Sequence, residues 1–181
     1  SASQVEIQSG IQFYDGITTA EIQEILIRSA SDLIDLDHPN YQFVAARLLL
    51  FSLRKQLFGR MRECPIVIDH VKKCVAKGVY DAEILDLYSE EEYNRLQSFI
   101  DHSRDFLFTY AGLRQVVDKY LVQDRSTGEV YETPQFMYLM IAATIFSKYP
   151  KETRLNYVRN YYDAISRHRI NIPTPIMAGV R

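Results

Sequence analysis

The sequence is poor in the residues that interrupt or cross-link a chain. Its 181 residues include only seven glycines, six prolines and two cysteines, a composition that favours long regular elements. Cys64 and Cys74 have no C-x-x-C spacing and no matching histidines, so a disulfide framework and a metal site are both disfavoured. We expect the two cysteines to be free thiols in a reducing compartment.

Long apolar runs and an excess of charge are missing as well. No apolar stretch approaches the roughly 18 residues that a membrane span requires, and no secretory signal opens the chain. The formal net charge of −2 gives no general attraction to nucleic acid or to an anionic membrane. We therefore expect a cytoplasmic globular protein with neither a nucleic acid nor a membrane as its partner.

Capping signals and apolar periodicity predict helices over most of the chain. Thr18-Thr19-Ala20-Glu21 and Ser89-Glu90-Glu91-Glu92 are capping boxes, in which a hydroxyl and a carboxylate satisfy free N–H groups. The first box opens an amphipathic helix of about five turns, and the second opens a helix that reaches Ile100. Further helices are expected from Tyr41 to near Gly59, over 67–75, over 136–146 and over 151–167, the last with Arg154 and Arg159 on its outer face.

One β element is expected among these helices. Residues 120–123 and 129–132 have strand character and flank the loop 124–128, which contains a glycine. Such a pair of short strands around a turn is typical of a β-hairpin. Thr133 is the expected N-cap of the following helix, with Pro134 at its first position.

The last ten residues differ in character from the helical stretch before them. Pro173 and Pro175 each fix φ and lack an N–H, and each pushes the preceding residue toward extended geometry. We therefore expect an extended segment over 172–180 that brings the Thr174 hydroxyl and nearby N–H groups against a ligand.

Several strings resemble one known family in the same order along the chain. They are "IQFYDGITTAEIQEILIRSASDLI", "YQFVAARLLLFSLRK", "FIDHSRDFLFTYAGLRQ", "KYLVQDRSTGEVYETPQFMYL", "YPKETRLNYVRNYYDAIS" and "IPTPIMAGVR". The chain is similar over nearly its whole length to the N-terminal segment of the large (α) subunit of class I aerobic ribonucleotide reductase.

The resemblance implies a mainly α fold: a helical N-terminal region with one β-hairpin that ends at the first strand of a ten-stranded α/β barrel. Residues 1–60 would be the C-terminal part of an ATP-cone-like region. Residues 61–170 would be a helical domain with the hairpin at about 120–132, and 171–181 the start of the catalytic barrel.

For the whole enzyme, the resemblance implies radical-based reduction of ribonucleoside diphosphates to deoxyribonucleotides. Its partners would be a barrel-containing remainder of the α subunit and a small β subunit that holds the metal-dependent radical cofactor. Cys64 and Cys74 match none of the family's redox or radical cysteines, so no catalytic residue and no metal ligand is assigned to this chain.

Three residues are expected to touch nucleotides. By resemblance, Thr174 contacts the substrate phosphate, and Thr19 and Lys55 contact the effector, ATP or dATP. A helix N-terminus and a lysine both suit phosphate, yet the residues alone also fit a turn threonine, a plain helix start and a surface lysine. The family's pattern is broken at Gln23, where close relatives carry a histidine.

Other interpretations stay open at the level of the sequence. The chain could be one subunit of a naturally split reductase or a fragment of a longer one. It could instead be a non-catalytic helical interaction module of reductase ancestry, or a nucleotide sensor that acts alone. The interaction module predicts that Thr174→Ala leaves the biological effect of the chain unchanged, and the nucleotide sensor requires ATP or dATP binding by the isolated chain.

Overall fold

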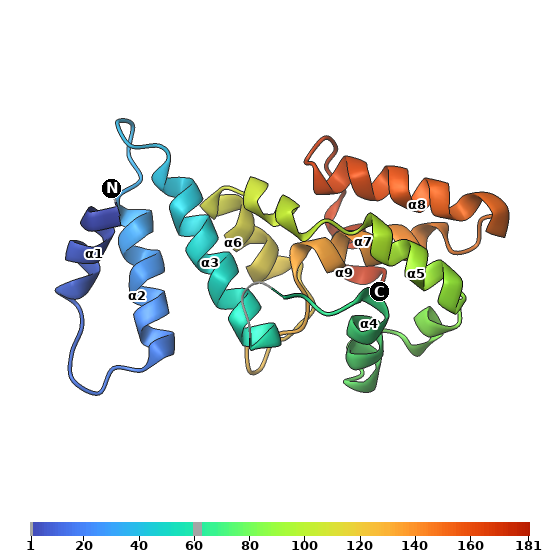
Figure 1. Cartoon of the computed structure of the whole chain (residues 1–181), viewed down its shortest axis with the longest axis horizontal. Coiled ribbons are helices and arrows are strands. Elements are labelled where there is room, and N and C mark those ends of the chain that lie inside the picture. Colours follow the sequence, from blue (N-terminus) through green and yellow to red (C-terminus); the bar gives the residue numbers. More distant parts are fainter. Residues whose placement is uncertain (1, 60–62) are drawn as a thin grey trace.

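The computed structural model describes residues 2–59 and 63–181 (Figure 1). The helices are α1 (Ala2–Gly10), α2 (Thr19–Asp32), α3 (Tyr41–Phe58), α4 (Val67–Ala76), α5 (Glu90–Phe99), α6 (Tyr110–Lys119), α7 (Pro134–Phe146), α8 (Lys151–Ser166) and α9 (Thr174–Gly179). Two 3₁₀ helices, η1 (Ala82–Leu85) and η2 (His102–Leu107), and a hairpin of β1 (Gln123–Asp124) and β2 (Glu129–Val130) lie between them. The expected mainly α fold with one hairpin is confirmed.

The molecule is elongated, with α1 and α2 at one end and α8 and α5 at the other (Figure 1). A small core of Val5, Ala30, Tyr41 and Ala45 joins α1, α2 and the start of α3. A much larger core continues from α3 through α4 to α8. Among the described helices, none is long and apolar enough to cross a membrane.

Helix α3 belongs to both cores. It packs against α2 on one side and against α6 and η2 on the other, and its buried residues include Ala45 toward the small core and Leu50 and Leu53 toward the large one. A helix that is apolar on most faces is buried on most faces. The boundary expected between 60 and 61 falls on residues 60–62, which lie outside the described part of the chain.

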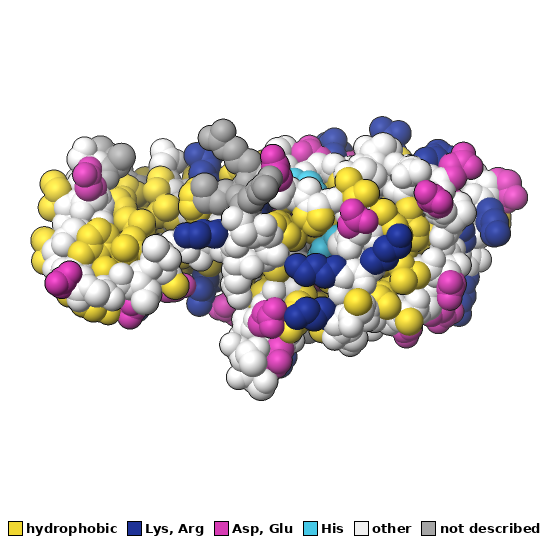
Figure 2. All heavy atoms as spheres, turned by 60° about the horizontal axis from the view of Figure 1, so that its bottom comes forward, with side chains coloured by type: hydrophobic (Ala, Val, Ile, Leu, Met, Phe, Trp, Pro, Cys, Tyr) yellow, Lys and Arg dark blue, Asp and Glu magenta, His cyan; other side chains and the backbone are white. Residues whose placement is uncertain are grey.

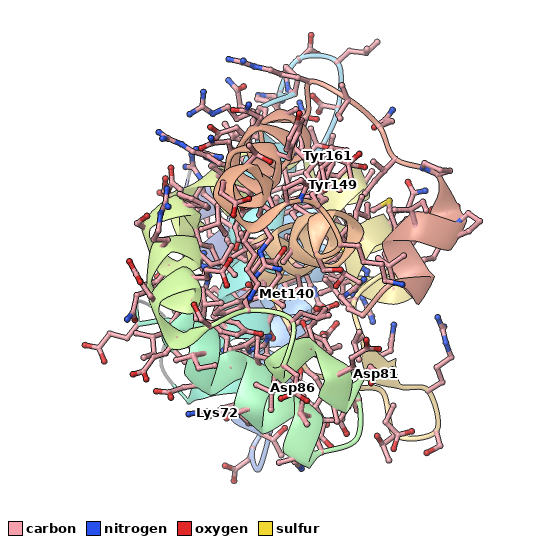
Figure 3. The ribbon with its side chains drawn as sticks, turned by 90° about the vertical axis from the view of Figure 1, so that its right-hand side faces the viewer. Lys72, Asp81, Asp86, Met140, Tyr149 and Tyr161 are labelled. Atoms are coloured by element: carbon pink, nitrogen blue, oxygen red, sulfur yellow. The ribbon has the colours of Figure 1, made fainter. Side chains whose placement is uncertain are left out.

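Helix α7 is the centre of the larger core. Every residue from Pro134 to Ala143 is buried, and α8, η2 and α9 pack around the helix. Met140 is 0% exposed, and in Figure 3 Tyr149 and Tyr161 lie above it and Lys72 and Asp86 below it. An all-round apolar sequence predicts this central position.

The capping signals are confirmed where they were expected. The Thr18 hydroxyl accepts the N–H of Glu21, whose carboxylate accepts the Thr18 N–H at 2.8 Å. Ser89 and Glu92 form the same reciprocal pair at the start of α5. Gly59 ends α3 with φ of 68°, a left-handed conformation that favours glycine.

The hairpin is confirmed with shorter strands than expected. β1 and β2 pair antiparallel, with Gln123 opposite Val130 and Asp124 opposite Glu129. Gly128 takes φ of 74° in the loop, which is why a glycine is suited to that position.

The extended segment expected over 172–180 is wrong for most of its length. Residues Thr174 to Gly179 form α9 instead, so no barrel strand is present among the described residues of this segment. Pro173 is the N-cap, with φ of −68° and ψ of 152°, and Pro175 lies in the first turn. A proline at either place removes no intrahelical hydrogen bond, because the first N–H groups of a helix have no partner within it.

Two further features differ from the sequence-based expectations. Arg154, expected on the outer face of α8, is only 4% exposed, whereas Arg159 is exposed. Helix α1 is a short helix that the sequence did not predict. Arg154 is buried because it has a charged partner on α5, which a pattern within α8 cannot reveal.

Candidate nucleotide sites

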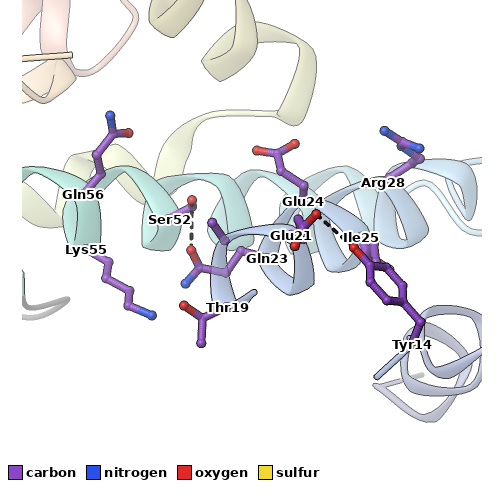
Figure 4. A pocket seen from close by; sticks show the side chains of 11 residues that line it. Tyr14, Thr19, Glu21, Gln23, Glu24, Ile25, Arg28, Ser52, Lys55 and Gln56 are labelled. Atoms are coloured by element: carbon purple, nitrogen blue, oxygen red, sulfur yellow. Dashed lines mark hydrogen bonds between the residues drawn. The ribbon is translucent and has the colours of Figure 1, made fainter. Parts of the chain in front are cut away.

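The chain reverses direction between α2 and α3, so the start of α2 lies beside the last turns of α3 (Figure 4). A groove of about 690 Å³ opens between them. Thr19, the first residue of α2, and Lys55, near the end of α3, both line this groove. The structure thus brings the two residues assigned to the effector into one site. We call it the α2–α3 groove.

One end of the α2–α3 groove is suited to an anion. Thr19 and Lys55 are exposed there, and Gln23 lies beside Thr19 (Figure 4). The Ser52 hydroxyl donates to the Gln23 Oε1 at 3.2 Å, which leaves the amide NH₂ of Gln23 free to donate. A hydroxyl, an amide, an ammonium group and the N-terminus of α2 are all donors that bind phosphate.

The other end of the groove is occupied by a hydrogen-bonded pair. Tyr14 donates from its hydroxyl to Glu21 Oε1 at 3.0 Å, while Glu21 Oε2 accepts the N–H of Thr18. The hydrogen bonds from Thr18 hold the pKa of Glu21 below its usual range. The Glu21 carboxylate is therefore an anion whose hydrogen-bonding needs are met by the N-cap of its own helix.

A buried ion pair on another face of α3, at the residue before Lys55, anchors this helix. Arg54, its neighbour on α3, donates from Nη2 to Asp105 Oδ2 at 2.9 Å and to the carbonyl of His102 at 2.6 Å. Gln135 of α7 donates to Asp105 Oδ1 at 2.9 Å. Burial raises the pKa of Asp105, and Arg54 opposes that shift. Helix α3 thus carries the groove on one face and is anchored to η2 and α7 by another.

Thr174 lies in a second cavity, apart from the α2–α3 groove. This cavity, of about 550 Å³, is lined by α6, by the end of η2 and by the segment that leads into α9. Thr174 is exposed there, and its Oγ1 lies 3.2 Å from the hydroxyl of Tyr120. His168, with φ of 55°, also lines the cavity and packs its ring against Phe108 at 4.4 Å.

The sequence did not assign a supporting role in these two sites to any residue, and it marked Gln23 only as a departure from the family's pattern. Gln23 follows Thr19 by four residues and Ser52 precedes Lys55 by three, so helical periodicity places each beside its neighbour. That signal could have found them. Tyr120 and Thr174 are 54 residues apart, and nothing local in the sequence connects them.

Cysteine and metal chemistry are not assigned to either site. Burial raises the pKa of Cys74 to about 12, so its sulfur is a protonated thiol at neutral pH. Burial raises the pKa of Cys64 as well. Within residues 2–59 and 63–181, no group of three His, Cys, Asp or Glu side chains could hold a metal ion.

Two family descriptions match separate parts of the chain. Residues 1–56 match the ATP cone domain, and residues 106–181 match the all-alpha domain of ribonucleotide reductase. The α2–α3 groove lies in the first match, and Thr174 and Tyr120 lie in the second.

Curated relatives match the chain from end to end. It is 54% identical over 181 residues to ribonucleoside-diphosphate reductase 1 subunit alpha of Escherichia coli, and 55% identical to the subunit alpha of Haemophilus influenzae. The subunit alpha of Enterobacteria phage T4 is 45% identical over 183 residues. In each case the match includes 100% of this chain and 24% of the relative. The chain therefore spans about a quarter of the length of these relatives.

Proposed function

Because the chain belongs to the family of ribonucleoside-diphosphate reductase α subunits, whose N-terminal region it matches, we propose that it has two roles in such an enzyme. It binds a nucleotide effector, ATP or dATP, in the α2–α3 groove. It also supplies Thr174 as a contact to the phosphate of the ribonucleoside diphosphate substrate.

The observation that carries the effector role is the meeting of Thr19 and Lys55 in one groove. Thr19 offers a hydroxyl at the N-terminus of a 14-residue helix, where the helix dipole favours an anion. Lys55 adds a compact positive charge. It takes part in none of the ion pairs found among the described residues. Together with Gln23, these groups match the needs of a polyphosphate.

Titration calorimetry of the 181-residue chain with ATP and with dATP tests this role. We expect binding that Lys55→Gln and Thr19→Ala each weaken by at least about ten-fold, the loss typical of a hydrogen bond to a charged group. Lys72→Gln is the matched control, because Lys72 is an exposed lysine of α4 outside the groove. Equal affinities in the wild type and the Lys55 variant would overturn the effector role.

The substrate role is tested in an assembled reductase. Here the chain functions with a barrel-containing remainder of the α subunit and a small β subunit that carries the radical cofactor. Thr174→Ala is expected to raise the KM for the diphosphate more than it lowers kcat, because a phosphate contact is made equally in the ground and transition states. An unchanged KM would favour the non-catalytic interaction module instead.

The proposed enzyme reduces ribonucleoside diphosphates to deoxyribonucleotides by radical chemistry. Its redox and radical cysteines lie outside this chain, which therefore contributes binding and regulation and no reacting group. We place the protein in the cytoplasm, where thiols such as Cys64 and Cys74 stay reduced.

A further inference from the structure

Helix α9 is tied to the hairpin region at both of its ends. At its first residue, the hydroxyl oxygens of Thr174 and Tyr120 lie 3.2 Å apart. Beyond its last residue, Arg181 donates from Nε to both carboxylate oxygens of Glu132, at 3.0 and 2.9 Å. Tyr120 precedes β1 and Glu132 follows β2, so the two ties hold α9 to one structural unit.

Arg181 also contacts the helix that carries Thr174 and the backbone of Tyr120. Its Nη1 donates to the carbonyl oxygen of Met177 in α9 at 2.6 Å, and its Nη2 donates to the carbonyl oxygen of Tyr120 at 2.9 Å. Tyr120 is therefore held by its backbone to Arg181 and by its hydroxyl to Thr174. The contacts close a ring from Thr174 through Tyr120, Arg181 and Met177 back along α9.

The ion pair with Glu132 holds the Arg181 side chain in place within this ring of contacts. The side chains of Arg181 and Glu132 are both 0% exposed. Glu132 also accepts the N–H of Val122 at 2.8 Å and the hydroxyl of the buried Tyr80. A buried guanidinium held by a carboxylate and two carbonyl oxygens cannot swing away without leaving several polar groups unpaired.

The ring of contacts bears on the direction in which the Thr174 hydroxyl donates its proton. A hydroxyl has one proton to donate and two lone pairs that accept, whereas an ionised phosphate oxygen only accepts. Thr174 must therefore donate its proton to a phosphate. A second hydroxyl that donates to Thr174 Oγ1 fixes the direction in which that proton points.

We infer that Tyr120 is a positioning residue that donates to Thr174 Oγ1 and directs the Thr174 proton toward the substrate phosphate. Arg181, anchored on Glu132, holds both Tyr120 and α9 in register for this contact. The inference rests on the proposed function, in which Thr174 contacts the phosphate.

Steady-state kinetics of the assembled reductase test the inference with a double-mutant cycle. Tyr120→Phe should raise the KM for the diphosphate about three- to ten-fold, the worth of one hydrogen bond, with kcat changed by less than about two-fold. In the Thr174→Ala background the same substitution should have no further effect, because Tyr120 acts only through Thr174. Tyr131→Phe is the matched control: Tyr131 donates to Glu129 at 3.0 Å on the same hairpin and does not line the cavity that holds Thr174. An unchanged KM in Tyr120→Phe, or an equal rise in the Thr174→Ala background, would overturn the inference.

A second measurement separates this inference from the proposed function. In the 181-residue chain, three-bond NMR couplings to the Thr174 methyl group should report a single χ1 rotamer. Tyr120→Phe and Arg181→Lys should average that rotamer, and Tyr131→Phe should not. If Thr174→Ala leaves KM unchanged while these variants average the rotamer, the phosphate contact fails and the positioning contact stands. A single rotamer in every variant refutes the positioning role.

Discussion

At the scale of single residues, Arg154 shows how a buried charge holds two helices together. Its Nε and Nη2 donate to the two carboxylate oxygens of Glu92 at 2.7 and 2.6 Å, and its Nη1 donates to the carbonyl of Ser147 at 2.9 Å. Its guanidinium also lies 4.3 Å from the centre of the Tyr88 ring. A bidentate, largely buried pair of this kind is stronger than a surface ion pair.

We therefore expect Arg154→Ala to lower the free energy of unfolding by about 2–3 kcal/mol. Arg159→Ala, at an exposed position of the same helix, should change it by less than about 0.5 kcal/mol. Urea denaturation of both variants against the wild type measures the difference. Equal losses would mean that the Glu92 pair contributes no more than an exposed arginine does.

Two histidines that pack against the buried Phe136 predict a loss of stability in acid. His70 stacks on Phe136 at 3.8 Å, and His102 meets the same ring edge-on at 4.9 Å. Burial lowers the pKa of each to about 4, from the ordinary 6.5. Well above pH 6.5 both are neutral in the folded and in the unfolded chain, so they do not make stability depend on pH there.

As the pH falls below 6.5, the unfolded chain takes up protons that the folded chain resists, so stability is lost between pH 6.5 and about 4. The loss should reach roughly 3 kcal/mol for His70, which is 1% exposed, and less for the half-buried His102. Urea midpoints at successive pH values measure it. His70→Gln should flatten the decline, whereas His38→Gln, an exposed position, should leave it unchanged.

At the scale of elements, two adjacent threonines separate capping from binding. Thr18 is the N-cap of α2, and Thr19 faces the α2–α3 groove. Thr18→Ala should cost about 1 kcal/mol of folding free energy because it breaks the capping box. Thr19→Ala should cost less than about 0.5 kcal/mol but weaken nucleotide binding. Thermal unfolding and calorimetry on the same pair of variants distinguish the two roles, and a reversed order of stabilities would contradict the assignment.

Element boundaries could be predicted where the signal is local. The capping boxes at Thr18 and Ser89 and the glycine cap at Gly59 are read from a few adjacent residues. The identity of α9 could not be predicted, because Pro173 and Pro175 disfavour the interior of a helix but suit its first turn. The tertiary contacts of α9, with α7 and through Thr174 and Arg181 with Tyr120, decide between the two outcomes.

The candidate sites were predictable to a lesser degree than the helices. Thr19, Lys55 and Thr174 were chosen by resemblance, and their supporting contacts come from distant parts of the chain. Tyr120 lies 54 residues from Thr174, and Glu132 lies 49 residues from Arg181. Contacts at such separations depend on the tertiary structure, which no local pattern in the sequence encodes.

At the scale of the whole molecule, α3 joins two cores of very different size. Among the described residues, the small core holds four buried hydrophobic side chains, whereas Ile7 of α1 and Ile11 in the turn after it are 66% and 82% exposed. Hydrophobic side chains gather visibly over this end of the molecule (Figure 2). A region with few buried contacts opens at a lower free energy than a large core does.

Hydrogen exchange of the 181-residue chain should therefore show α1 and α2 opening before α7, whose residues from Pro134 to Ala143 are buried. A nucleotide bound in the α2–α3 groove stabilises only the closed form of α2. At a hundred times its Kd it should slow the exchange of α2 amides by about 100-fold, corresponding to about 2.7 kcal/mol. The amides of α7 should keep their rates if the two regions open independently, and Lys55→Gln should abolish the protection of α2. Equal slowing in α2 and α7 would instead show that α3 couples both cores into one cooperative unit, through which a bound effector stabilises the whole chain.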